Sequence, residues 1–121
     1  MPCIGNVPSI VASGSIDKPS GGNISATTVY TPSDAGVYRI SIYATMASGF
    51  GGGAATSVTW TDDRGARNAG VPFGNLQGSS NNDAGAVIAF RALADAIQLS
   101  TDMAGSSSVA YTLYYVIEQL A

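Results

Sequence analysis

The sequence predicts an all-β fold of sandwich or barrel type, and three observations lead to that prediction. Turn-forming residues interrupt the chain at short intervals, as in KPSGG (18–22), DDRG (62–65) and AGSSS (104–108). The runs between them are rich in Val, Ile, Thr and Tyr, which favour extended strands. In the two clearest runs, large apolar residues occupy every second position. Turn signals every ~8–12 residues with such runs between them are typical of antiparallel sandwiches and barrels.

The clearest strand of the first half is expected between Gly36 and Gly49. One side of this strand carries an alternating apolar set that should face a core, namely Tyr38, Ile40, Ile42, Ala44 and Met46. The other side is mixed and consists of Val37, Arg39, Ser41, Tyr43 and Thr45. This second side carries more apolar surface than a water-facing strand requires.

The last thirteen residues, VAYTLYYVIEQLA (109–121), predict a strand of the same kind. Its core-facing positions are Val109, Tyr111, Leu113, Tyr115 and Ile117. The alternate positions are Ala110, Thr112, Tyr114, Val116, Glu118 and Leu120, and they are far from uniformly polar. Since a half-solvated strand should be polar on one side, we expect something to cover this second side as well.

Further strands are expected at 7–16, 23–31, 55–61, 86–91 and 96–103. In three of them the inward positions are Thr56, Val58 and Trp60, then Ile88 and Phe90, then Ile97, Leu99 and Met103. The stretch AVIAFRALADAIQL (86–99) also fits helical spacing through Phe90, Leu93, Ala94 and Ile97, and its alanines favour helix. We favour two strands broken near Ala94–Asp95, because the flanks have turn character. One short helix is the alternative.

Length and composition predict one soluble domain, residues 1–121. Charged residues make up 11% of the chain, against about 25% in ordinary domains. The net charge is −3, with one Lys and four scattered Arg, so no nucleic-acid partner is expected. No signal peptide is visible, and no apolar run approaches the ~18 residues of a membrane span. We therefore expect no membrane partner and synthesis in a cytoplasm.

The residues that usually carry catalysis are missing, so we expect no enzyme, no catalytic residues, no cofactor and no metal. The chain has no His to activate a nucleophile, and its one Cys, Cys3, cannot form an internal disulfide. Asp62 and Asp63 lie in TDDRG, which reads as a tight turn ending at Gly65. A calcium site at these two carboxylates is the alternative, without any calcium-loop spacing to support it. GFGGG (49–53) lacks the Lys of a phosphate loop and is interpreted as a turn.

The mixed sides of the two best strands predict an interface between copies of the chain. If these strands are neighbours in one sheet, their apolar side chains form one patch, which would be a liability on a monomer. Arg39 and Glu118 would share that face and balance each other's charge, because an isolated buried ion is too costly. The residues we expect at the oligomer interface are Val37, Arg39, Tyr43, Tyr114, Val116, Glu118 and Leu120.

Two stretches carry a resemblance to known proteins. TTVYTPSDAGVYRISIYATM (27–46), with Thr28 or Thr31 followed by Pro32, Gly36 and Tyr38, resembles the strand–corner–strand of tumour-necrosis-factor and complement-head jelly rolls. TLYYVIEQL (112–120) resembles the final strand of that fold. Both stretches, and SVTWTDDRGARN (57–68), are also similar to small virion proteins of tailed bacteriophages. The single Cys and the absence of a signal peptide favour the phage branch.

The resemblance implies an antiparallel jelly-roll β-sandwich of about eight strands that forms a homotrimer and brings no catalytic residues. It implies a structural protein of the virion, made in the host cytoplasm, that decorates a phage capsid and stabilises it. The alternative is the tip of a tail fibre that binds a receptor or a host surface glycan. That tip would use the loops SGFGGG (48–53) and QGSSNNDAG (77–85), near Phe50 and Phe73.

Overall fold

The fold is an eight-stranded antiparallel jelly roll, as predicted. The computed structural model describes residues 8–46, 55–72, 82–103 and 110–121. The strands are β1 Ser9–Lys18, β2 Thr27–Tyr30, β3 Gly36–Met46, β4 Ala55–Asp62, β5 Gly65–Pro72, β6 Asn82–Ala92, β7 Ile97–Asp102 and β8 Tyr111–Gln119. Within these described ranges, no helix is long and apolar enough to cross a membrane.

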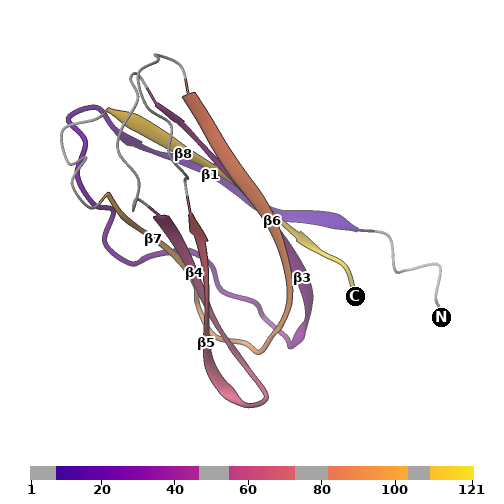
Figure 1. Cartoon of the computed structure of the whole chain (residues 1–121). Helices are drawn as coiled ribbons and strands as arrows, with labels where there is room; N and C mark the ends of the chain where they lie inside the picture. Colours follow the sequence, from indigo (N-terminus) through magenta and orange to yellow (C-terminus); the bar gives the residue numbers. More distant parts are fainter. Residues whose placement is uncertain (1–7, 47–54, 73–81, 104–109) are drawn as a thin grey trace.

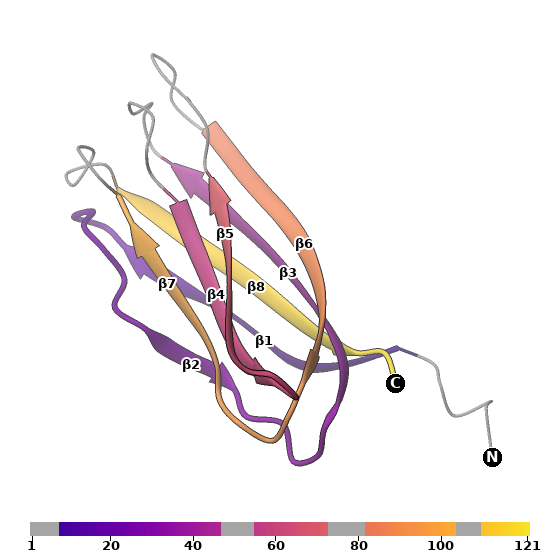
Figure 2. The same ribbon diagram turned by 60° about the horizontal axis from the view of Figure 1, so that its bottom comes forward.

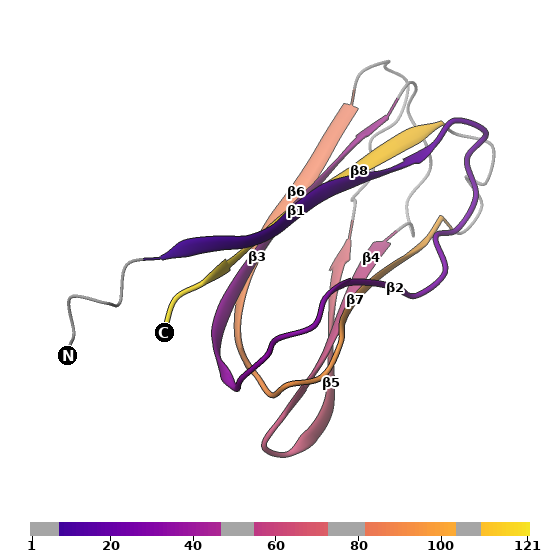
Figure 3. The same ribbon diagram turned by 180° about the vertical axis from the view of Figure 1, so that it is seen from behind.

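The strands form two four-stranded sheets that face each other (Figures 1 and 2). Sheet A has the order β1-β8-β3-β6, and sheet B has the order β2-β7-β4-β5. Strands close in sequence mostly alternate between the sheets, which gives the jelly-roll path. The start of β1 and the end of β8 lie side by side, because Ser9 pairs with Gln119 (Figure 3).

The two strands with mixed second sides are neighbours at the centre of sheet A, as the interface prediction required. β3 pairs antiparallel with β8 from Tyr38–Gln119 to Met46–Tyr111. On its other side β3 pairs with β6 along its whole length. β1 pairs with β8 and forms one edge of the sheet.

The core lies between the sheets and consists of the sides that the alternation predicted to face inward. Its buried apolar members are Ile24, Tyr38, Ile40, Ile42, Ala44, Val58, Phe90, Ala92, Ile97, Leu99, Met103, Tyr111, Leu113 and Ile117. Trp60 of β4 stacks on Phe90 of β6, with ring centroids 4.3 Å apart, and so joins the two sheets. Val109, predicted for this core, lies outside the described residues.

The resemblance segment 27–46 forms a corner that carries the chain from β2 in sheet B to β3 in sheet A. Pro32 and Gly36 are buried at this corner. The Tyr38 hydroxyl donates a hydrogen bond of 3.1 Å to the carbonyl of Asp34 and closes the turn. β2 is shorter than the predicted strand at 23–31, because residues before Thr27 make their contacts outside a ladder.

A buried hydrogen-bond chain ties the segment before β2 to both sheets. The Ile24 N–H donates to Thr101 Oγ1 at 2.7 Å, and Thr101 Oγ1 lies 2.7 Å from the Tyr111 hydroxyl. The Tyr111 hydroxyl donates to the Gly22 carbonyl at 2.6 Å. Since a carbonyl only accepts, the Thr101 hydroxyl must donate to Tyr111. Both buried hydroxyl groups of this network, those of Thr101 and Tyr111, are therefore satisfied.

Two local predictions are confirmed here. TDDRG is the turn of the β4–β5 hairpin: Asp62 pairs with Gly65, Asp62 Oδ1 accepts from the Arg64 N–H at 2.8 Å, and Gly65 has a φ of 108°. Only glycine adopts that φ without strain. The stretch 86–99 forms two strands, β6 and β7, with a break at residues 93–96, and contains no helix.

Candidate functional site: the outer face of sheet A

The register of sheet A brings all seven predicted interface residues onto its outer face. Arg39 pairs with Glu118, Ser41 with Val116 and Tyr43 with Tyr114. At the end of the sheet, the Leu120 N–H donates to the Val37 carbonyl at 2.8 Å. β3 and β8 thus form a double row of outward side chains along the middle of the sheet.

This face collects the exposed apolar residues of the described chain. The large hydrophobic residues that remain exposed are Ile10 (67%), Val87 (63%), Tyr43 (48%), Tyr114 (37%) and Val37 (36%), and all five lie here. The outer face of sheet B is different in kind. Its outward positions include Thr28, Ser57, Thr59, Gln98 and Ser100, which are small or polar. Among the residues whose exposure the structure describes, the large exposed apolar side chains therefore lie on sheet A and not on sheet B.

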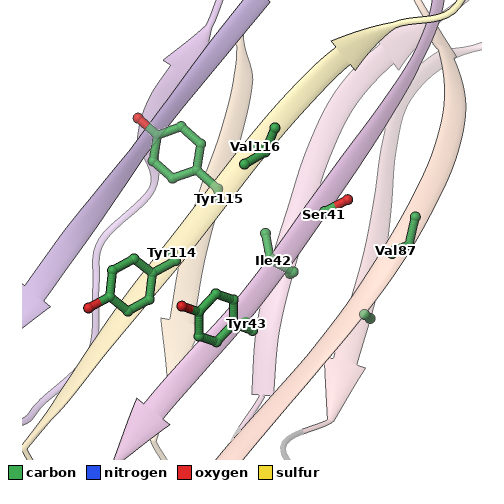
Figure 4. Close-up of a pocket in the computed structure, with 8 residues that line it drawn as sticks. Ser41, Ile42, Tyr43, Val87, Tyr114, Tyr115 and Val116 are labelled. Carbon is green, nitrogen blue, oxygen red and sulfur yellow. The ribbon is translucent and has the colours of Figure 1, made fainter. Parts of the chain in front are cut away.

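Tyr43 and Tyr114 form the aromatic centre of the face. Their ring centroids are 4.8 Å apart, and their planes differ by 18°. Figure 4 shows the two rings side by side on β3 and β8, with both hydroxyl groups pointing toward the same end of the sheet. Each ring shields one side of the other, so the pair behaves as one rigid apolar ridge.

Arg39 and Glu118 form an ion pair across the same two strands. Arg39 Nη2 lies 2.9 Å from Glu118 Oε1, and Arg39 Nε donates to the same oxygen at 3.0 Å. Their side chains are 39% and 22% exposed. The pair separates Val37 and Leu120 from the larger apolar group around the tyrosines. The centre of the face therefore carries two charges but no net charge.

A shallow hollow of about 440 Å³ lies beside the tyrosine pair. The residues that line it are Ser41, Ile42, Tyr43, Ala86, Val87, Tyr114, Tyr115 and Val116 (Figure 4). The register explains the hollow. Ser41 and Ala86 are small, and Ser41 lies between the larger Tyr43 on β3 and Val87, its pairing partner on β6. Tyr43 and Val87 therefore rise on either side of a low floor.

Two residues of this face, Val87 and Ile10, were not predicted. Val87 pairs with Ser41 on the outer side of β6, next to the hollow. Ile88 and Phe90 were predicted to face inward, so the alternation of the strand could have placed Val87 on the outer face. Ile10 pairs with Glu118 on β1, but the register shifts between Ile10 and Ala12. Such a bulge leaves no clear trace in the hydrophobic pattern, so Ile10 could not be found that way.

The other candidates from the sequence take ordinary structural roles where they are described. Asp63 Oδ2 lies 2.8 Å from Arg91 Nε, and Asp62 Oδ2 lies 3.6 Å from Arg67 Nε, so both carboxylates brace the hairpin. Over the described ranges, no group of three or more His, Cys, Asp or Glu residues is placed to hold a metal ion. Cys3, Phe50, Phe73 and the loop residues 48–53 and 77–81 lie outside the described residues. Residues 82–85, expected in the second loop, instead begin β6.

No family model matches the chain, and no curated protein matches it in sequence. Solved structures resemble its fold. The PRD1 vertex protein P5 has a TM-score of 0.50 and 12% identity, over 93% of this chain and 99% of that chain. The globular domain of zebrafish complement 1qA protein has a TM-score of 0.44 and 11% identity, over 89% and 94%. The apo CBM1 of BiXyn10A has a TM-score of 0.44 and 12% identity over 81% of this chain. The match spans only 61% of the length of that protein. At these identities the similarity shows the fold alone.

Proposed function

We propose that this protein is a structural component of a phage virion, a homotrimer that decorates the capsid and stabilises it. The outer face of sheet A is the contact between its copies. The observation that carries the proposal is the gathering of every exposed large apolar residue of the described chain on that one face. An apolar surface of this kind on a free monomer promotes aggregation, whereas contact with sister copies buries it.

The electrostatics of the face support burial between copies. Arg39 and Glu118 already neutralise each other within one chain, at 2.9 Å. Burying them as a pair avoids the large cost of an unpaired buried charge. Tyrosines are common at subunit contacts, since they bury much area at a low entropic cost and keep a hydroxyl for hydrogen bonding. Tyr43 and Tyr114 meet that description.

The proposed location on a virus particle is supported by the similarity in fold to a phage protein. The PRD1 vertex protein P5 shares the jelly roll over nearly its whole length, and its name states a position at a vertex. On a capsid, many weak copies of a decoration protein act together, so modest contacts add up to a stable shell. Sites of local three-fold symmetry would receive the homotrimer.

The experiment compares Tyr114→Arg with the matched control Thr59→Arg on the outer face of sheet B. Light scattering after gel filtration should give a trimer for the wild type and the control, and a monomer with unchanged β-type circular dichroism for Tyr114→Arg. A normal trimer of Tyr114→Arg would contradict the assignment of the face.

The role on the particle is tested by adding the purified protein to expanded capsids that lack it. Saturable, stoichiometric uptake is expected, with loss of uptake for Tyr114→Arg. No uptake by the wild type, together with binding to an array of host surface glycans, would replace decoration with the fibre-tip function.

A further inference from the structure

We propose that β6, an edge strand of sheet A, pairs antiparallel with β6 of a second copy about a two-fold axis at Val87. The two four-stranded sheets would then form one continuous sheet. The contact is made by main-chain groups in the plane of the sheet, and it leaves the outer face of sheet A uncovered. This inference therefore does not rest on the proposed function. If the outer face joins copies into trimers, the edge contact links one trimer to another.

The free side of β6 is the longest strand edge of the described chain. β6 has 11 residues, whereas the other edge strands, β1, β5 and β2, have 10, 8 and 4. Figure 2 shows β6 at the side of sheet A. Its ladder with β3 runs from Asn82 to Ala92 without a register shift, and no strand of the described ranges pairs with its other side. One row of its N–H and C=O groups is therefore available to a further strand.

The usual protection against edge pairing is present at one edge of sheet A and missing at the other. Proline, lysine and bulges commonly block such pairing. β1 has a register shift between Ile10 and Ala12 and ends at Lys18. The sequence of β6, NDAGAVIAFRA, contains neither Pro nor Lys, and only its second and tenth residues are charged. Val87, at its midpoint, is 63% exposed. Sheet A is thus open to pairing along β6.

The sequence of β6 is complementary to itself in one antiparallel register. With Val87 opposite Val87, all 11 residues overlap, and Asp83 of each copy stands opposite Arg91 of the other. Between these positions, Gly85 stands opposite Ala89, and both residues are small. The alternation of a strand places all five positions on the same side of the sheet. Because opposite charges attract across paired strands, both ends of the overlap favour this register.

Other pairings of the same two strands are poorer. A parallel pair in register would place Arg91 opposite Arg91 and Asp83 opposite Asp83, and like charges in that position repel. A shift by two residues would separate both charge pairs and shorten the overlap. Arg91 Nε already donates to Asp63 Oδ2 at 2.8 Å, but a guanidinium has five N–H donors and can bind a second carboxylate. Since Arg91 is exposed, these charges select the register more than they add affinity.

The main chain supplies most of the contact. In an antiparallel pair every second residue pair exchanges two hydrogen bonds, so an overlap of 11 residues gives about ten. A typical protein interface carries about the same number. The apolar part is small, because it consists mainly of the two Val87 side chains at the axis. We therefore expect the pairing to be weak in dilute solution and strong where many copies are held close together.

A disulfide tests the position of the two-fold axis. Val87→Cys is made in a Cys3→Ser background, so that position 87 carries the sole thiol of the chain. In the proposed pair the two Cα atoms at position 87 lie about 4.5–5.5 Å apart, which suits a disulfide. Ala89→Cys is the matched control, because position 89 is exposed on the same side of the same strand. Its two copies would lie roughly 14 Å apart along the strands, too far for a disulfide.

Under mild oxidation, Val87→Cys should form the linked dimer at least about 10-fold faster than Ala89→Cys, since pairing raises the local thiol concentration only at the axis. Equal rates for the two variants would overturn the two-fold contact.

Exchange of the charges tests the register. Asp83→Arg and Arg91→Asp each place like charges opposite each other at both ends of the overlap. Each variant alone should raise the half-association concentration in light scattering about 10-fold. An equimolar mixture restores opposite charges at both ends and should associate like the wild type. Asp17→Arg, the same substitution on β1, should leave the edge contact unchanged, and circular dichroism checks that all variants fold.

A mixture that associates no better than its two components would overturn the register. If the protein forms trimers and binds capsids but neither edge test responds, this inference fails and the proposed function stands. If Val87→Cys cross-links selectively in a protein that neither trimerises nor binds capsids, the edge contact stands and the proposed function fails.

Discussion

The carbonyl oxygen of Ala121 lies 2.7 Å from the point that a Cβ atom on Gly36 would occupy. The same carbonyl accepts a hydrogen bond of 3.0 Å from the Val37 N–H. The end of the last strand is therefore fastened against the start of β3, and this close approach requires glycine.

We expect Gly36→Ala to lower the free energy of unfolding by about 1–3 kcal/mol, because backbone must shift to admit the methyl group. Gly70→Ala is the matched control, since nothing lies within 4 Å of its added Cβ. The control should change stability by at most about 0.5 kcal/mol. Urea unfolding measures both, and equal effects would refute the close-approach argument.

The stacked tyrosines should stabilise each other in the single chain. A double-mutant cycle with Tyr43→Ala and Tyr114→Ala should give a coupling of about 0.5–1.5 kcal/mol. The control cycle pairs Tyr114→Ala with Thr59→Ala on the other sheet and should be additive within about 0.5 kcal/mol. Unfolding at several protein concentrations separates this coupling from assembly. Zero coupling in both cycles would mean that the rings stack without stabilising the chain.

The last strand should show a sharp contrast between adjacent residues. Leu113 is fully buried, and Leu113→Ala should cost about 2–5 kcal/mol through lost burial and the cavity it leaves. Thr112 faces the other way, and its hydroxyl bonds Asp17 Oδ1 at the surface, so Thr112→Ala should cost less than about 1 kcal/mol. Denaturant midpoints decide the matter, and similar costs would place the strand in the wrong register.

Tyr111 should make the fold sensitive to alkali. Burial raises the pKa of Tyr111 above its ordinary value, although the hydrogen bond with Thr101 opposes that effect. The folded chain therefore holds the phenol proton more tightly than the unfolded chain. Its stabilising contribution is complete below the ordinary pKa of about 10 and is lost as the pH rises through the higher folded pKa.

Thermal unfolding between pH 8 and 12 checks this prediction. Tyr111→Phe should lower stability by about 1–3 kcal/mol at pH 8, because the Thr101 hydroxyl and the Gly22 carbonyl lose their partner. It should also weaken the decline above pH 10. Burial raises the pKa of Tyr38 as well, so Tyr38→Phe should remove a separate part of the decline. An unchanged alkaline profile in the double variant would exclude both tyrosines as its cause.

The sequence predicted most of the fold because its strongest signal is alternation. The inward sides of β3, β7 and β8 follow directly from the period of two. β5 was not foreseen, since GARNAGVP has few residues that favour strands. It forms because the turn at Gly65 brings the chain back beside β4, whose free backbone groups then pair with it. Here the pairing partner outweighs the low strand propensity of the segment.

The candidate site was predicted in part for the same reason. Tyr43, Tyr114 and Val116 were found because both sides of their strands are apolar, which is visible within one strand. The hollow depends on the small Ser41 lying opposite Val87, a relationship between strands more than 40 residues apart in sequence that no local pattern records. The outward orientation of Ile10 depends on a register shift in β1. That shift interrupts the alternation from which the inward and outward residues were predicted.

That shift has a consequence for natural variation. With strict alternation, position 10 would share the inward side of Ala12, and the extra residue in β1 is what reverses it. Deleting Val11 would leave hydropathy and net charge almost untouched and would remove the bulge, yet Ile10 would stay outward, because Ile10 and Ala12 would then be adjacent residues paired with Glu118 and Ile117 in a regular ladder. The fold should therefore tolerate the loss of this one codon, whereas a single-codon deletion in the regular part of β1 would turn the residues on one side of it to the opposite face of the sheet.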